Sequence, residues 1–364
     1  MLTNKPTNNP FVHTADSTPR VMLDVVIALL PGIVAAYLAF GAVALSLIAV
    51  SVGSALVAEF VFSLLFIGRI DTLADGSAVV TGLLMAFTLG AFTPLPAVSF
   101  GAAAAVIFGK LLWGGLGRNV FNPALVGREF MTVFFPVAMT SGSVWYNQAA
   151  VNHATLQLTG SRFVDQLFFH PSGAVGEYSV VALIIGGLYL LLRRRITWHV
   201  PFSLLTAFTA TVALLRACGV EGMDFSLGGV LLGAVFMATD MPSSPTTTAG
   251  RCYYGTMIGL VAAVLIACGV RYEYMSFSIL LLNGAAPFID RCLRPRVWGL
   301  SLDKRARLVR YALLTLTVAA ACAIVGMPLF SSIHAVRYIV YAYVLVIVVH
   351  YVRNDLRTEA TVSA

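Results

Sequence analysis

Hydrophobic residues along this chain gather in long runs that are separated by short polar or glycine-rich connections, from residue 21 to residue 352. An apolar run of about 20 residues can cross the hydrocarbon core of a bilayer as one α-helix. The pattern therefore predicts an all-α integral membrane protein with about 10–12 transmembrane helices. The expected spans are 21–39, 42–67, 77–93, 95–113, 124–139, 177–192, 200–217, 226–239, 252–270, 275–290, 308–327 and 334–352.

Three of the expected spans, 77–93, 124–139 and 226–239, are short and are flanked by Gly and Pro. Short, interrupted spans are typical of half-helices, which often belong to inverted repeats with a binding site at the repeat interface. A weak internal similarity points the same way. LADGSAVVTGLLMAFTLG leads, one span later, to GGLGRNVFNPALVGRE, and SLGGVLLGAVFMATD leads to MPSSPTTTAGRCYYG. We therefore expect an inverted repeat.

Composition supports a membrane location and excludes a soluble protein. Hydrophobic residues make up 59% of the chain and charged residues only 11%, whereas a soluble domain has about 25% charged residues. The net charge is +7. In a membrane protein, an excess of Lys and Arg indicates which loops face the cytoplasm, so we do not interpret it as a sign of nucleic-acid binding. Residues 1–20 are polar and have no signal-peptide pattern. With the N-terminus in the cytoplasm, only four of the 23 Lys and Arg residues fall outside, which also places loop 140–176 on the outer face.

Two polar stretches are candidates for ligand binding. In GGLGRNVFNPALVGRE the glycines permit tight turns, and Asn122 followed by Pro123 predicts a capped helix start whose N–H groups could meet a phosphate or carbonyl. Arg118 and Asn119 lie in this stretch; Arg118 and Arg128 could equally lie at the cytoplasmic interface. The second stretch, ATDMPSSPTTTAGR, offers Asp240, Thr246 and Thr247. The alternatives are a structural re-entrant turn and a solvated turn.

Carboxylates inside apolar spans are further candidates, because a charge at membrane depth is costly. Glu59 lies in the centre of its expected span and Glu129 follows Arg128 in a short one. Both are candidates for an ion or proton path, and pairing inside the protein is the alternative. Asp24 and Glu177 lie near predicted helix ends and could simply reach water. The histidines show no spacing typical of a metal site.

The motifs GGLGRNVFNPALVGREF, DGSAVVTGLL, GAVGEYSVVALIIGGLYLL, FMATDMPSSPTTTAGR and APFIDRCLRPRVWG occur in this chain. Together they resemble the B subunit of sodium-translocating NADH:quinone reductase and the D subunit of the Rnf ferredoxin:NAD oxidoreductase. The opening HTADSTPRVMLDVVIALLPG is most similar to the Rnf member. The resemblance covers about residues 10–300. It implies a flavoprotein subunit of an ion-translocating redox complex in the bacterial inner membrane, with a fold similar to urea transporters.

The resemblance also implies cofactors. Family members carry FMN, joined through its phosphate to a threonine on the outer side by a separate flavin transferase, and some hold a non-covalent riboflavin. Ala154-Thr155 aligns with the family's Ala-Thr, so Thr155 is the expected anchor. Ala149, Asn152 and His153 stand where the family motif D-x-x-S/T-G-A-T has Asp, Ser or Thr, and Gly. A flavin held without a covalent bond, or no flavin, is the alternative.

The expected organisation is a cytoplasmic segment (1–20), a family-type membrane domain (21–300) with outer loop 140–176, and an added C-terminal transmembrane hairpin (301–364). Expected partners are the other subunits of an Rnf-type or quinone-reductase-type complex, the flavin transferase and the lipid bilayer. The sequence leaves open which of the two complexes contains the chain and whether Na⁺ or H⁺ is moved. A cofactor-free channel or transporter on the same scaffold is the alternative from another functional class.

Overall fold

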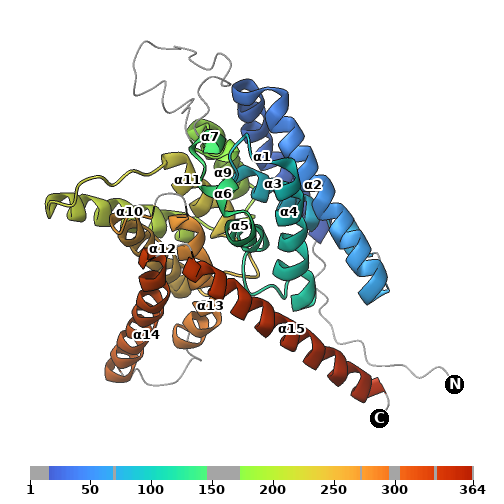
Figure 1. The fold of residues 1–364 in the computed structure, drawn as a ribbon. Coiled ribbons are helices and arrows are strands. Elements are labelled where there is room, and N and C mark those ends of the chain that lie inside the picture. Colours follow the sequence, from blue (N-terminus) through green and yellow to red (C-terminus); the bar gives the residue numbers. More distant parts are fainter. Residues whose placement is uncertain are drawn as a thin grey trace.

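The computed structural model describes residues 16–68, 71–145, 173–270, 273–294, 304–331 and 334–362. This part of the chain is helical and contains no strand (Figure 1). The first group of helices is α1 (Thr18–Phe40), α2 (Ala42–Phe62), α3 (Ser77–Phe87), α4 (Leu95–Gly109), α5 (Pro123–Phe134), α6 (Pro136–Thr140) and α7 (Gly142–Trp145). The second is α9 (Val180–Leu192), α10 (His199–Ala217), α11 (Leu227–Leu232), α12 (Thr248–Ala267), α13 (Tyr274–Cys292), α14 (Lys304–Ser331) and α15 (His334–Val362).

Short turns extend several of these helices. Two are π-turns, η1 (Ser63–Ile67) after α2 and η6 (Gly233–Met237) after α11. Three are 3₁₀ turns, η2 (Asp71–Asp75), η3 (Leu111–Trp113) and η5 (Val175–Glu177). Extra residues in a helical turn are frequent near functional sites. η6 ends three residues before Asp240.

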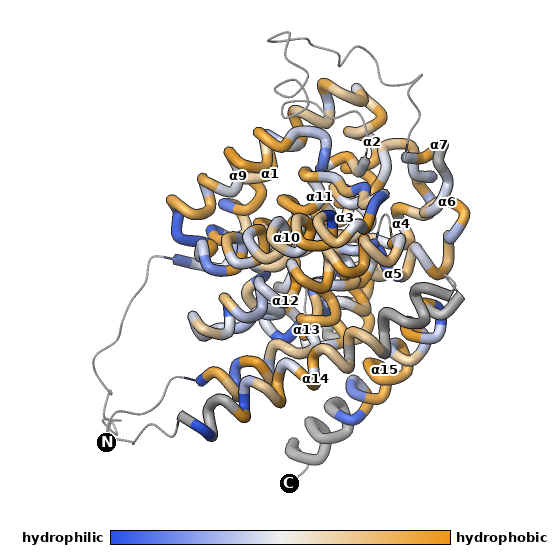
Figure 2. Tube along the Cα trace, turned by 90° about the vertical axis from the view of Figure 1, so that its left-hand side faces the viewer, coloured by the Kyte–Doolittle hydropathy of each residue, from blue (hydrophilic) through white to orange (hydrophobic). Residues whose placement is uncertain are grey.

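The chain is an all-α integral membrane protein. Among the described residues, six helices are long and apolar enough to cross a membrane, and four shorter ones are apolar as well. Figure 2 shows apolar residues along the helices, with hydrophilic residues gathered at helix ends and connections. Large apolar side chains such as Leu65, Leu192 and Leu316 are well exposed, as expected where lipid replaces water as the solvent.

The helices pack in an order that occurs twice. In the first group α2 packs against α3 and α4, and α4 packs against α5. In the second group α10 packs against α11 and α12, and α12 packs against α13. The groups meet where α1 packs against α9. By this order α3 corresponds to α11–η6, and α5 to α13.

The internal similarity in the sequence matches GGLGRNVFNPALVGRE with MPSSPTTTAGRCYYG. These two loops do not occupy equivalent positions in the repeated packing order of the helices. Residues 114–122 lead into α5, whereas residues 241–247 lead into α12, which corresponds to α4. The match between these two loops in the expected repeat is therefore wrong. Both loops end in a helix N-cap followed by small residues, and this local pattern can occur at the start of any helix.

Close approach between helices depends on small residues. At Gly186 of α9, an added Cβ would lie 2.1 Å from the Ala28 carbonyl oxygen of α1. At Gly127 of α5, it would lie 2.5 Å from the Gly101 carbonyl oxygen of α4. Small residues let helix backbones approach closely inside a membrane, where the hydrophobic effect does not drive helices together. This packing holds the short helices around the candidate site.

Candidate functional site

A cavity of about 540 Å³ lies where the end of α3, the middle of α5 and the starts of α11 and α13 meet. Its lining mixes charged, aromatic and apolar side chains. We call it the Arg128 cavity; among its lining residues are Arg128, Trp145, Glu177, Arg216, Asp224 and Met275. Its volume is typical of cavities that hold cofactors and small molecules.

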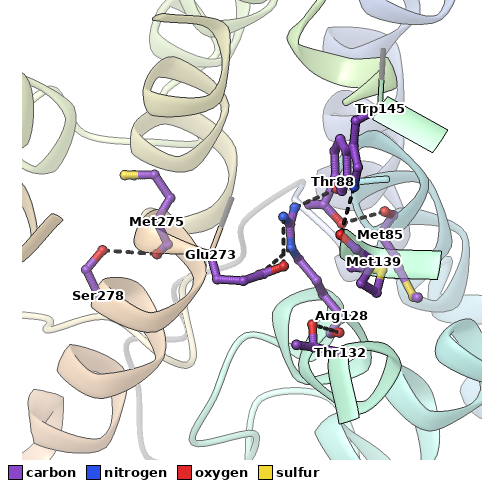
Figure 3. Close-up of polar contacts among 9 residues, drawn as sticks. All are labelled: Met85, Thr88, Arg128, Thr132, Met139, Trp145, Glu273, Met275 and Ser278. Carbon is purple, nitrogen blue, oxygen red and sulfur yellow. Dashed lines mark hydrogen bonds and ion pairs between the residues drawn. The ribbon is translucent and has the colours of Figure 1, made fainter. Parts of the chain in front are cut away.

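Arg128 organises one wall of this cavity (Figure 3). Its Nε and Nη2 donate to the two carboxylate oxygens of Glu273, at 2.8 and 3.2 Å, and Nη1 donates to the Thr88 carbonyl at 2.5 Å. The guanidinium carbon lies 5.7 Å from the centre of the Trp145 ring. One planar cation thus joins α5 to the end of α3, to the start of α13 and to α7. Only arginine offers this fork of donors.

The sequence analysis gave the cytoplasmic membrane interface as one possible position for Arg128. This alternative is wrong, because Arg128 is 4% exposed and forms an ion pair inside the protein. The sequence analysis missed Glu273 and Trp145. Glu273 lies outside any expected span, at the position just before α13. A carboxylate directly before an apolar helix is a weak signal, since it also suits a solvated helix start.

The expected flavin anchor, Thr155, lies outside the described residues. Trp145 and Gly173 are the described residues that flank this segment, and both line the Arg128 cavity. The last described residue before this segment and the first one after it thus both lie at the cavity.

A second polar cluster surrounds Asp240, and we call it the Asp240 network. Asn119 Nδ2 and Ser243 Oγ donate to Asp240 Oδ2 at 3.2 and 2.7 Å. Asn122 Nδ2 donates to the Met237 carbonyl at 3.1 Å. The structure therefore brings together three of the predicted residues, Asn119, Asn122 and Asp240, from stretches more than a hundred residues apart.

Asn122 caps α5 as predicted, with its Oδ1 accepting from the N–H groups of Ala124 and Leu125 at 3.0 and 3.4 Å. We expected free N–H groups at this helix start that could bind a ligand. For Ala124 and Leu125 this expectation is wrong, because their N–H groups already donate to Asn122. The Asn119 Oδ1 atom, in contrast, is buried and has no hydrogen-bond partner among the described residues. Such an atom marks a place that can accept a donor from a ligand.

The other predicted binding residues lie apart from this network. Thr246 and Thr247 donate through their hydroxyls to Asp290 of α13, both at 2.9 Å, so their hydroxyls join α12 to α13. Arg118 is exposed and packs over Gly114, one of three glycines with positive φ in this loop. The tight turns expected from these glycines are confirmed.

The predicted ion-path residues occupy two different environments. Glu59 is fully buried and accepts from Lys110 Nζ at 2.6 Å, and Lys110 also bonds to Ser77. Glu129 is 5% exposed, and neither of its oxygens has a hydrogen-bond donor within the described part of the chain.

The two remaining carboxylates of the sequence analysis are also internally placed. Asp24 of α1 accepts from Arg195 at 2.6 Å and from Arg193 at 3.3 Å, beyond the end of α9. A further hydrogen bond from Arg195 lowers the pKa of the exposed Asp16 carboxyl. Glu177 lies at the cavity. The water contact expected for Asp24 is wrong, since its side chain is 6% exposed.

Comparison with known proteins gives a consistent result. The model of the NQR2, RnfD, RnfE family matches residues 5–299. The D subunit of the Na(+)-translocating ferredoxin:NAD(+) oxidoreductase complex of Acetobacterium woodii is 38% identical over 312 residues, covering 82% of this chain and 96% of the relative. The D subunit of the ion-translocating oxidoreductase complex of Ectopseudomonas mendocina is 34% identical, covering 80% and 94%. Its counterpart in Erwinia tasmaniensis is 32% identical, covering 80% and 97%. Helices α14 and α15 lie beyond the family match.

Proposed function

The chain belongs to the NQR2, RnfD, RnfE family, and from this premise we propose that it is a membrane subunit of an Rnf-type ion-translocating oxidoreductase complex that carries electrons through bound flavin. Its relatives are named as the D subunits of ion-translocating oxidoreductase complexes, which supports this choice over the B subunit of a quinone reductase. The other subunits supply the electron donor and acceptor, so the chain is not catalytic alone. We place it in the bacterial inner membrane with its N-terminus in the cytoplasm.

The single observation that carries the flavin assignment is the Arg128 cavity, because the segment with Thr155 is flanked by two of its lining residues. The lining fits a flavin chemically. Trp145 and Met275 offer apolar surface to an aromatic ring, and Arg128 and Arg216 offer positive charge to a phosphate or a reduced ring. A phosphoester at Thr155 would hold FMN at this cavity.

The Asp240 network is the proposed site of a second, non-covalent flavin such as riboflavin. Its carboxylate, two amides and the unpartnered Asn119 Oδ1 suit the hydroxyl and imide groups of such a ligand. Thr246 and Thr247 support this site indirectly by fixing the start of α12 through Asp290.

A flavin supplies a ring that accepts one or two electrons, while the protein sets its position and electrostatic surroundings. This chain's part is to orient the ring, to exclude water, and to balance charge. The Arg128 guanidinium donates to Glu273 and Thr88, so its charge stays fixed beside the cavity and is offset in part by the Glu273 carboxylate. A buried charge of this kind acts strongly on neighbouring groups because the local dielectric is low.

Ion coupling is proposed to involve the two buried glutamates. Glu129 is adjacent in sequence to a cavity residue, Arg128, whereas Glu59 belongs to a separate buried cluster with Lys110. If both take part, Glu59→Gln and Glu129→Gln in the assembled complex lose ion pumping while electron transfer continues. Undiminished pumping in either variant removes that residue from the path.

The assignment is tested by in-gel flavin fluorescence of the denatured chain after co-expression with its flavin transferase. Wild type should give a fluorescent band, Thr155→Ala a dark one, and Thr159→Ala, a matched change in the same loop, a fluorescent one. A dark wild-type band with flavin released on denaturation would indicate non-covalent binding. A chain without any flavin would favour the channel or transporter.

A further inference from the structure

Three consecutive arginines, Arg193, Arg194 and Arg195, lie in the turn between α9 and α10, and two carboxylates face them. Arg195 donates to Asp24 at 2.6 Å and to Asp16 at 3.0 Å. The half-exposed Arg193 donates to the same Asp24 carboxylate at 3.3 Å. Arg194 is exposed, and no residue in the described part of the chain accepts a hydrogen bond from its guanidinium. The turn therefore keeps a positive charge that the protein does not neutralise.

The backbone of Arg194 has an unusual conformation for an arginine. Its φ of 56° lies in the left-handed region, and among the described residues it is the only non-glycine with a positive φ. Here the N–H groups of Arg194 and Arg195 close α9 by donating to the carbonyls of Leu191 and Leu190, at 3.0 and 2.9 Å. Glycine usually occupies this position, because a side chain destabilises the left-handed conformation. An arginine held there indicates a role for the side chain itself.

Large apolar side chains flank this turn on both sides. Leu192, the last residue of α9, is 83% exposed. Trp198 directly precedes α10 and Phe202 lies in its first turn; they are 56% and 60% exposed, and their ring centres are 5.7 Å apart. Helix α9 itself contains no charged residue, so an apolar helix meets the arginines within one residue. Tryptophan is enriched at the boundary between hydrocarbon and lipid headgroups, and the turn lies at such a boundary.

We propose that residues 192–202, here called the Arg194 turn, bind the headgroup of an anionic phospholipid. Arg194, with a smaller share from Arg193, offers positive charge to the phosphate. Leu192, Trp198 and Phe202 contact the acyl chains. A phospholipid fits this surface better than a free anion, because a free anion would leave the apolar flank without a partner. It is the one ligand of the bilayer that joins an anionic head to an apolar tail at this depth.

The Arg194 turn lies where the two groups of helices meet. Asp24 belongs to α1, so its hydrogen bonds with Arg193 and Arg195 join α1 to the end of α9. A headgroup bound beside these hydrogen bonds would steady that joint, because a ligand that binds only the folded chain stabilises it. This inference goes beyond the proposed function and requires no bound flavin.

The test is native mass spectrometry of the purified full-length chain in a neutral detergent, with phosphatidylglycerol titrated in and phosphatidylcholine as the uncharged comparison. Wild type should bind phosphatidylglycerol more tightly. Arg194→Gly should lose about fivefold in that affinity, the loss expected for one cation at an anionic lipid surface. Arg194→Lys should retain most of it. Arg291→Gln, which removes an exposed arginine in the last turn of α13, should bind as wild type does.

Thermal stability provides a readout that a purely structural arginine would move in the other direction. Without lipid, Arg194→Gly should melt about 1–3 °C above wild type, because glycine adopts the left-handed conformation readily. With phosphatidylglycerol, wild type should gain more than Arg194→Gly. Arg194→Gln should lose the same affinity as Arg194→Gly without the gain in stability.

Equal binding of phosphatidylglycerol by wild type and Arg194→Gly would overturn the proposal, as would equal binding of the two lipids by wild type. Displacement of the lipid by inorganic phosphate would overturn it in favour of a free-anion site. No binding by the isolated chain would also overturn it and would leave an acidic segment of another subunit as the occupant. The titration is repeated in Thr155→Ala, where unchanged lipid affinity keeps this result separate from the flavin assignment.

Discussion

Lys110 Nζ lies 2.6 Å from Glu59 Oε1, and the two side chains are 2% and 0% exposed. Lys110 stands at the end of α4, whereas Glu59 lies in the last turn of α2, and Ser77 at the start of α3 bonds to the same ammonium group. This ion pair therefore fixes the starting point of the short helix α3. Removing one partner of a buried pair leaves an uncompensated charge.

Lys110→Met should lower the free energy of unfolding by about 3–5 kcal/mol, because it strands the Glu59 carboxylate. Arg193→Met is the control, since the Arg193 side chain is 53% exposed and such pairs contribute about 0–1 kcal/mol. The double variant Lys110→Met, Glu59→Gln should recover part of the loss. Denaturant titration in mixed micelles, followed by circular dichroism, measures all three. Equal stability of Lys110→Met and wild type would contradict the prediction.

Gly186→Ala should destabilise the contact between α9 and α1, where its methyl group would lie 2.1 Å from the Ala28 carbonyl oxygen. The expected loss is about 1–3 kcal/mol, as for other overpacked sites. Gly53→Ala is a matched helical control, because nothing lies within 4 Å of its added methyl group. That control should be neutral or gain about 0.5–1 kcal/mol from the helix preference of alanine. The melting temperatures of the two variants should therefore move apart, and a shared downward shift would argue against this packing.

Tyr343→Phe should loosen α15 from the rest of the chain. The Tyr343 hydroxyl donates to the Phe108 carbonyl at 2.7 Å and accepts from Trp113 Nε1 at 3.0 Å. Loss of this bridge should cost about 1–3 kcal/mol, since it leaves the Trp113 N–H without that acceptor. Hydrogen exchange along α15 should accelerate in Tyr343→Phe. It should stay unchanged in Tyr338→Phe, whose ring is 73% exposed.

Asp240→Asn should weaken retention of a non-covalent flavin, because a charged acceptor for Asn119 and Ser243 is lost. A charge-assisted hydrogen bond contributes about 1.5–3 kcal/mol, which corresponds to about tenfold or more in affinity. Flavin released from the purified chain by denaturation measures the effect. Covalent in-gel fluorescence should not change, and Thr256→Val, at an exposed position of α12, should release wild-type amounts. Unchanged release from Asp240→Asn would remove the Asp240 network as a flavin site.

The C-terminal hairpin has a clear place in the fold. Helices α14 and α15 form two long arms beside the main body (Figure 1), and α15 packs against α5 and η3. The region contains two helices, and their arrangement as an added transmembrane hairpin stays a prediction. The contacts of Tyr343 are made within the chain itself.

The sequence by itself determined the class of fold and most helix positions. Long apolar runs with few charges can be stable only in a bilayer, and a bilayer requires helices that satisfy their own backbone hydrogen bonds. Local chemistry also set several boundaries, such as the start of α5 at Pro123 after the Asn122 cap. The expected span 124–139 is instead divided at Phe135, because the residue before a proline disfavours helix.

Only the tertiary structure decided which polar residues share a site. Asn119 meets Asp240 across 121 positions, Lys110 meets Glu59 across 51, and Arg128 meets Glu273 across 145. A single sequence carries no local signal for such pairs, because each residue alone also suits a capped turn, a membrane interface or a solvated end. Short helices that end inside the protein bring these side chains together, and low dielectric surroundings then make each pairing energetically decisive.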